Sequence, residues 1–377
     1  MLQTKRASVK DRLHNAIQHV RGQGPLGLSY VAWIIIILVA AKIAAFIWLF
    51  NLTYVEPYGK LQPSEWWLVF QRWDSAFYER IATLGYVDLK DWAFFPAFPA
   101  TIKFINFFIG SSSVSTSLAG LIFGLTWVPV YYKIGSFYMG EKNSAYSTLM
   151  FAFFPTVLLF TSVGYGEGLW LTFTLLGWYL YLKDKHALSS AALAVSALAR
   201  VPGVVLPALL FLYRLKKRKF KQALVYVLPF LALTAWFLYG YTQTGELFAP
   251  VAAGGKTAWN PDLTFIDLFV SPMLKGEPPP AWGVDTVFII MIISLFAYLS
   301  LKTFSVDKVL GFYSFSLLGL YLATAYLWSL SRFLPFTFPL WLNVKVKSKW
   351  QVAVYVVINF LLAILVWSEF LSDRWAG

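Results

Sequence analysis

Long apolar runs alternate with short polar or basic stretches over nearly the whole chain. These runs cover residues 29–50, 93–110, 116–133, 144–160, 166–182, 187–213, 222–241, 284–301, 309–328 and 350–370. About 20 mainly apolar residues cross a bilayer as a helix, and a helix satisfies its own backbone groups there. The pattern therefore predicts an all-α polytopic membrane protein with about 9 to 11 transmembrane helices.

Composition excludes a soluble fold, because 59% of the 377 residues are hydrophobic and only 13% are charged. Soluble domains have an apolar share near one half. The net charge of +13 falls in short clusters between the apolar runs, of which residues 214–221 are the strongest. Such clusters face the cytoplasm in polytopic proteins, so they indicate topology and argue against a nucleic-acid partner.

Cysteine and histidine usage narrows the chemistry further. The chain has no cysteine, and its three histidines, His14, His19 and His186, lie outside the strongest apolar runs. Disulfides and thiolate metal sites are therefore excluded. Metal chemistry and histidine acid–base chemistry within the membrane are not expected.

Basic flanks orient the chain. Residues 1–28 are predicted to form a basic cytoplasmic tail, and residues 29–377 a single transmembrane domain with exterior loops at 51–92 and 242–283. Between residues 93 and 213, five full crossings keep the alternation but leave Glu167 on the inner side. Alternatively, two of these segments are broken, re-entrant helices. The run Ala199-Arg-Val-Pro-Gly203 favours this second option, since Arg, Pro and Gly inside a membrane segment need a cavity or a partner helix.

The first exterior loop is unusual, because residues 51–92 hold six of the eighteen acids together with Trp66, Trp67, Trp73 and Trp92. Aromatic residues beside acids indicate short helices at the membrane interface. Asp74 and Tyr78 are four apart and would share one face of such a helix. In a plainer interpretation, Arg72 pairs locally with Asp74 and the tryptophans merely anchor the interface.

The motif around Asp74 resembles a known family. RWDSAFYERIATLGY at residues 72–86, followed by FFPAFP at 94–99, is similar to the signature of the PIG-V family, the second mannosyltransferase of GPI-anchor assembly, and its prokaryotic relatives. Further pieces follow in the family's order: FP at 154–155, YGE at 165–167, ARVPG at 199–203, TGELF at 244–248 with Trp259, SRFLP at 331–335 and FP at 338–339. The resemblance spans residues 66–340. The chain departs from the family's usual Tyr-Ser-Glu and Thr-Arg-Pro runs but keeps Glu167 and Arg200.

The resemblance implies a fold and an activity. The family belongs to the GT-C superfamily of membrane glycosyltransferases, which use a lipid-phosphate sugar donor and an acidic residue in the first exterior loop. We therefore expect a GT-C-type bundle and an inverting enzyme. It would move a hexose, with mannose the expected sugar, from a dolichyl or polyprenyl phosphate. The acceptor would be a hydroxyl of a lipid-linked glycan or glycolipid on the exterior or lumenal face.

Site residues follow from this chemistry. A base must take the acceptor's proton, and Asp74 fits this role. Arginine suits the phosphate of the donor, so Arg332 is the first choice and Arg200 the second; a structural pair of Arg200 with Glu167 is the alternative. Predicted substrate-binding residues are Glu167, Tyr78, Trp73, Arg72 and Trp259, and Glu246 with Trp259 could cap the site. No cofactor is required, although a divalent ion at Asp74 stays an open alternative.

Competing classes remain at this point. A secondary transporter or lipid flippase would also be all-helical, but it would place its acids near the bilayer midplane, whereas here they gather in the first loop. A non-catalytic subunit of a glycosylation complex would not need Asp74. The expected partners are the lipid donor, the lipid acceptor and membrane lipids. The expected location is the plasma membrane of a prokaryote or the endoplasmic reticulum of a eukaryote.

Overall fold

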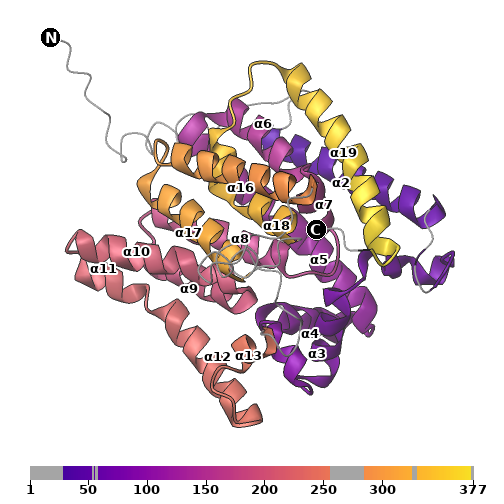
Figure 1. The fold of residues 1–377 in the computed structure, drawn as a ribbon, viewed down its shortest axis with the longest axis horizontal. Helices are drawn as coiled ribbons and strands as arrows, with labels where there is room; N and C mark the ends of the chain where they lie inside the picture. The colour runs from indigo at the N-terminus through magenta and orange to yellow at the C-terminus, as the bar shows by residue number, and fades with distance from the viewer. Residues whose placement is uncertain (1–28, 53–54, 56–57, 255–283, 325–328, 375–377) are drawn as a thin grey trace.

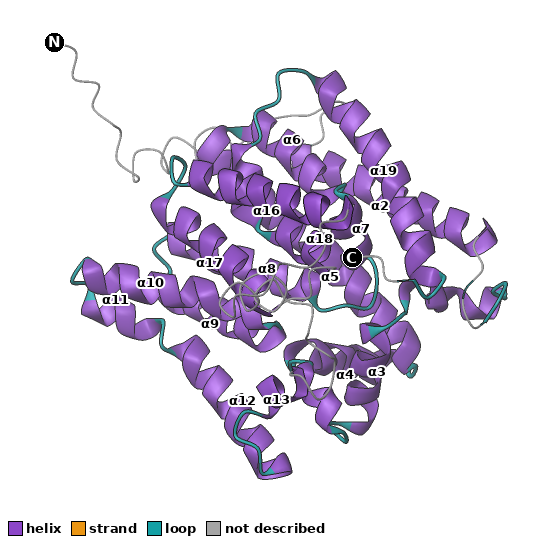
Figure 2. Ribbon diagram, viewed as in Figure 1, coloured by secondary structure: helices purple, strands orange, loops and turns teal. Residues whose placement is uncertain are grey.

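The structure is a computed structural model that describes residues 29–52, 55, 58–254, 284–324 and 329–374. Helices make up the regular structure of this part, and the described residues contain no strand; an isolated bridge joins Val55 and Gly59 (Figure 2). The predicted all-α fold is therefore confirmed. The basic tail and most of the second exterior loop, including Trp259, lie outside the described residues.

Among the described helices, four stretches are long and apolar enough to cross a membrane. They are α2 (Tyr30–Leu52), α5 (Ser112–Met139), α11 (Phe220–Val225) with α12 (Leu228–Thr244), and α19 (Lys349–Leu371). The chain is thus an integral membrane protein, as predicted. The total number of crossings stays a prediction.

Shorter helices fill the middle of the chain. They are α6 (Glu141–Ala152), α7 (Pro155–Phe160), α8 (Glu167–Leu182), α9 (His186–Ala199), η4 (Val201–Val204) and α10 (Val205–Lys216). The apolar run 187–213 is not one continuous helix but is broken between α9 and α10, because Pro202 cannot donate a backbone hydrogen bond. Gly203 packs so tightly that a β-carbon there would overlap the backbone of Ser196. The break predicted at Ala199-Arg-Val-Pro-Gly203 is confirmed.

The first exterior loop folds into short helices, as predicted. They are η2 (Pro63–Phe70), α3 (Asp74–Leu84) and η3 (Leu89–Ala93), and α4 (Ala97–Ile109) follows them. In Figure 1, α3 and α4 lie together at one end of the bundle, near α13 (Ala249–Gly254) and the end of α12. Trp92 does not serve as the interface anchor considered for it, because it is 1% exposed and stacks on Trp236 of α12.

The C-terminal part returns to the centre of the bundle through α16 (Val284–Thr303), α17 (Lys308–Thr324), α18 (Leu330–Phe333), η7 (Leu334–Phe336) and η8 (Phe338–Asn343). Two prolines, Pro335 and Pro339, are the second residues of the two 3-10 helices and keep this stretch from forming one long helix. Figure 1 shows α18 near the middle of the molecule, close to α7 and α8. The short helix α18 therefore brings Arg332 into the interior, where its side chain is 3% exposed.

Candidate active site

Four charged side chains from four distant segments meet in one cluster. Asp74 begins α3, Glu167 begins α8, Arg200 follows the last residue of α9, and Arg332 lies in α18. We call these four residues the charge cluster. Their meeting also settles one alternative: because Glu167 joins Asp74, a topology that puts the two on opposite sides of the membrane is wrong.

Arg332 is the centre of the charge cluster. Its Nε donates to Glu167 Oε1 at 2.7 Å, and its Nη2 donates to Asp74 Oδ2 at 3.1 Å. Arg200 Nη1 lies 2.6 Å from the same Glu167 oxygen. The pair of Arg200 with Glu167, set out above as the alternative for Arg200, is therefore present. It does not isolate Arg200, because Glu167 is shared with Arg332 and through it with Asp74.

Local structure explains the places of the two acids. Each is the first residue of a helix, where the partial positive charge of the helix end and unpaired backbone N–H groups favour a carboxylate. The residue before Asp74, Trp73, has a φ of 50°, a conformation that is rare for a bulky residue. Strained backbone of this kind tends to concentrate at functional sites. Arg200 stands at the Pro-Gly break, where an extended backbone turns its side chain toward Glu167.

Burial divides the charge cluster into a closed and an open side. The side chains of Glu167 and Arg332 are 1% and 3% exposed, whereas those of Arg200 and Asp74 are 18% and 24% exposed. Two positive and two negative charges balance, which is what buried ions require. Asp74 and Arg200 are thus the members that a molecule from outside the protein reaches first.

Aromatic rings surround the buried guanidinium. The Cζ atom of Arg332 lies 4.4 Å from the ring centre of Phe160, 4.7 Å from that of Tyr165 and 5.0 Å from that of Phe333. Such rings attract a cation through their faces and exclude water. Tyr165 also accepts a hydrogen bond from the backbone N–H of Asp74 at 3.1 Å. Sequence reasoning gave Tyr165 no role, although it lies two residues before Glu167 in the YGE run.

Tyr78 lies on the same helix as Asp74, one turn later, as predicted. Its side chain is 3% exposed, and its ring packs edge-on against Phe94 and Phe98. A β-carbon at Gly166 would lie 3.2 Å from the Tyr78 hydroxyl, which places this hydroxyl beside the start of α8. Burial is the main cause that raises the pKa of Tyr78, so the hydroxyl stays protonated.

The other predicted substrate contacts are placed differently. Arg72 donates to the carbonyl oxygen of Leu371 at 3.0 Å and so ties the first exterior loop to the end of α19. Trp73 is 38% exposed. Substrate binding by Arg72 and Trp73 stays a prediction, and Trp259 lies outside the described residues. The described residues contain no group of three acidic or histidine side chains placed to hold a metal ion.

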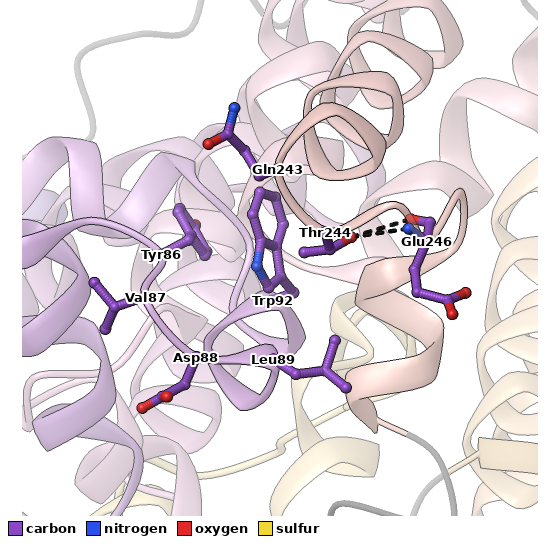
Figure 3. A pocket seen from close by; sticks show the side chains of 8 residues that line it. All are labelled: Tyr86, Val87, Asp88, Leu89, Trp92, Gln243, Thr244 and Glu246. Carbon is purple, nitrogen blue, oxygen red and sulfur yellow. Dashed lines mark hydrogen bonds between the residues drawn. The ribbon is translucent and has the colours of Figure 1, made fainter.

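A separate pocket of about 300 Å³ lies between the first exterior loop and the end of α12 (Figure 3). Its lining residues are Tyr86, Val87, Asp88, Leu89, Trp92, Gln243, Thr244 and Glu246. The Tyr86 hydroxyl donates to the carbonyl oxygen of Phe94, whose ring contacts Tyr78. None of the four residues of the charge cluster lines this pocket. Glu246 lines this pocket, and its expected role as a cap over the site, together with Trp259, stays a prediction.

Comparisons with known proteins agree with the sequence motif. No family model matches the chain. Over 137 residues the chain is 26% identical to GPI mannosyltransferase 2 of Schizosaccharomyces pombe (strain 972 / ATCC 24843), a stretch that covers 35% of this chain and 29% of that protein. The chain thus matches less than a third of this curated relative's length. The similarity to the second mannosyltransferase of GPI-anchor assembly, inferred from the motif, is confirmed.

Two solved structures are also similar in fold. Both are of ArnT from Cupriavidus metallidurans. The structure bound to undecaprenyl phosphate has a TM-score of 0.47 at 13% identity and matches 89% of this chain and 60% of that one. The apo structure has a TM-score of 0.49 at 12% identity and matches 89% of this chain and 59% of that one.

Proposed function

We propose that this protein is an inverting GT-C-type glycosyltransferase. It transfers a hexose, with mannose as the sugar, from a dolichyl or polyprenyl phosphate to a hydroxyl of a lipid-linked glycan or glycolipid. The reaction takes place on the exterior or lumenal face of the membrane. The observation that carries this proposal is the charge cluster, in which the partly exposed carboxylate of Asp74 is bonded to Arg332, and Arg332 shares Glu167 with Arg200, within a chain similar to a GPI mannosyltransferase.

Asp74 is the base in this proposal. As the acceptor oxygen attacks the anomeric carbon, its proton passes to a carboxylate oxygen of Asp74. The bond between the anomeric carbon and the phosphate oxygen breaks, and the lipid phosphate leaves with the electron pair. Attack opposite to the leaving group inverts the anomeric centre. Asp74 suits the role because it is the more exposed of the two acids, at 24% against 1% for Glu167.

In this proposal Arg200 is the first choice for the donor phosphate and Arg332 the second, the reverse of the order expected from the sequence. Arg332 is buried and bonded to both carboxylates, so it fixes the position of Asp74. Arg200 is more exposed, and the structure shows only Glu167 as its ion-pair partner among the described residues. A guanidinium has five N–H donors in a planar fork that matches phosphate oxygens. Arg200 is therefore the better placed of the two to hold the donor phosphate and stabilise the negative charge that develops on it.

Glu167 and Tyr78 complete the proposed site. In the described part of the chain, the Glu167 Oε2 atom is buried and has no hydrogen-bond partner. A buried carboxylate oxygen without a partner is costly, and a sugar hydroxyl would satisfy it. The protonated Tyr78 hydroxyl beside Gly166 supplies a donor for a sugar or phosphate oxygen.

An assay of the purified protein tests this proposal. Radiolabelled polyprenyl-phosphate mannose is supplied with a panel of lipid-linked acceptors, and wild type is compared with Asp74→Asn. The matched control is Asp88→Asn, an acid of the same loop whose side chain is 64% exposed and pairs with Arg80. We expect Asp74→Asn to lower the transfer rate about 100-fold or more, in the range of a lost general base, and Asp88→Asn to retain most activity.

Two results would contradict the proposal. An undiminished rate for Asp74→Asn would remove the catalytic assignment. If the wild type moved the labelled lipid across sealed liposomes without forming a new glycosidic bond, the protein would be a transporter or flippase instead.

A further inference from the structure

Lys42 is a buried cation in the middle of the apolar helix α2. Its side chain is 5% exposed, and Lys42 is the only charged residue of that helix. The Nζ atom donates to the carbonyl oxygen of Thr161 at 2.7 Å and also to the Ser162 hydroxyl. In the described part of the chain, no carboxylate lies within ion-pair distance of Lys42. A charge inside a membrane helix is costly and usually marks a functional position.

The group that Lys42 binds is the end of a broken helix. Thr161 follows the last residue of α7, where backbone carbonyl groups lack partners within the helix and the helix dipole favours a cation. Lysine side chains near helix ends bond such carbonyls. Here the lysine comes from a different helix, so the bond also fixes α2 to the end of α7.

The turn at residues 161–166 is also held by backbone contacts. The N–H of Gly164 donates to the carbonyl oxygen of Phe70 at 2.8 Å. Helix α5 presents Gly120 and Gly124 to the turn, and a β-carbon at either would overlap a carbonyl oxygen of Val163 or Thr161. The turn thus packs directly against α5, and the Nζ atom of Lys42 reaches the same place, because it would lie 3.3 Å from a β-carbon at Gly124.

This turn leads directly into the charge cluster. It contains Tyr165, which accepts the backbone hydrogen bond of Asp74, and it is followed at once by Glu167, the first residue of α8. A displacement of the turn therefore moves both the residue that orients Asp74 and the carboxylate that Arg332 and Arg200 share.

We propose that Lys42 is a positioning residue, which holds the turn at residues 161–166 in place so that Tyr165 and Glu167 fix the geometry of the charge cluster. Its role in catalysis rests on the proposed transferase function, whereas its hold on the turn does not. Lys42 acts through the turn and does not touch the substrate.

Three variants test this inference: Lys42→Met, Lys42→Arg and the control Leu38→Met. Met keeps the length of the lysine side chain without its donors, and Leu38 is a buried residue one turn earlier on α2. For Lys42→Met we expect faster amide hydrogen exchange in peptides that cover residues 161–166, measured by mass spectrometry in nanodiscs. We also expect kcat to fall about 10- to 100-fold with KM values within about twofold of wild type, because misplaced catalytic groups affect the reacting geometry.

Lys42→Arg keeps a cation with donors and is expected to restore most of the exchange protection and of kcat, while Leu38→Met changes neither. If Lys42→Met does not fold, Ser162→Ala removes one acceptor of Lys42 and should produce a smaller change in the same direction. The inference is overturned if amide exchange at residues 161–166 is as slow in Lys42→Met as in the wild type. Where Lys42→Met does not fold, the same result in Ser162→Ala overturns it. It is also overturned if Lys42→Arg behaves like Lys42→Met. If the wild type transfers no sugar, the proposed function fails, but the exchange measurement still decides whether Lys42 holds the turn.

Discussion

Replacing Arg332 with glutamine removes the cation that joins the two carboxylates of the charge cluster. The guanidinium is 3% exposed and bonds Glu167 through Nε and Asp74 through Nη2. Without it, Arg200 alone is left to balance two acids, and its 2.6 Å contact is with Glu167. The variant therefore leaves the charge cluster with two carboxylates and one guanidinium, so that one negative charge has no compensating cation.

The expected loss of stability follows from the burial of Arg332. Removing one partner of a buried ion pair costs about 3–5 kcal/mol, because the other charge is left without compensation. An exposed pair is worth about 0–1 kcal/mol. Arg374 and Glu369 form such a pair, with side chains 68% and 47% exposed, so Arg374→Gln is the matched control. The double variant Arg332→Gln/Glu167→Gln removes an acid together with the cation and should recover part of the lost stability.

The assay is reversible unfolding in mixed micelles, in which a denaturing detergent is titrated and tertiary structure is followed by near-ultraviolet circular dichroism. We expect Arg332→Gln to lose several times more stability than Arg374→Gln, and the double variant to lose less than the sum of its two single changes. Equal losses for the two arginine variants, or strict additivity in the double variant, would refute the reasoning that Arg332 compensates buried acids.

Three further predictions concern activity. Arg200→Lys should raise KM for the lipid-phosphate donor roughly tenfold with a smaller effect on kcat, since an ammonium cannot form the paired hydrogen bonds of a guanidinium; an effect confined to kcat would place the phosphate elsewhere. Tyr78→Phe should lower kcat/KM about tenfold, and by the same factor from neutral to mildly alkaline pH. The effect is expected not to change with pH because burial raises the pKa of Tyr78 and keeps its hydroxyl protonated across that range. If the loss of kcat/KM in Tyr78→Phe vanished with rising pH, the hydroxyl would ionise in that range. Glu246→Gln should leave the rate within about twofold of wild type, because the pocket that it lines includes no residue of the charge cluster; a large loss would give Glu246 the capping role first expected for it.

Asp74 shows how far local sequence leads. Its motif predicted a short helix that carries Asp74 and Tyr78 one turn apart, because such a feature depends on neighbours along the chain. Arg200 was likewise singled out by the Pro-Gly break beside it. Sequence alone assigned Arg332 to the phosphate before Arg200, whereas the structure shows Arg332 to be the more buried of the two.

What the sequence determined by itself was the class of fold and the identity of the charged residues, since hydrophobic length and the rarity of charges inside apolar runs are properties of each segment. Only the tertiary structure decided which of these charges meet. The Arg332–Glu167 bond joins residues 165 positions apart, and the Arg332–Asp74 bond joins residues 258 apart. Lys42 had no assigned partner in the sequence, yet it bonds the turn 119 residues away. Such contacts depend on how broken helices pack, and a pattern read along one segment carries no information about the segment opposite.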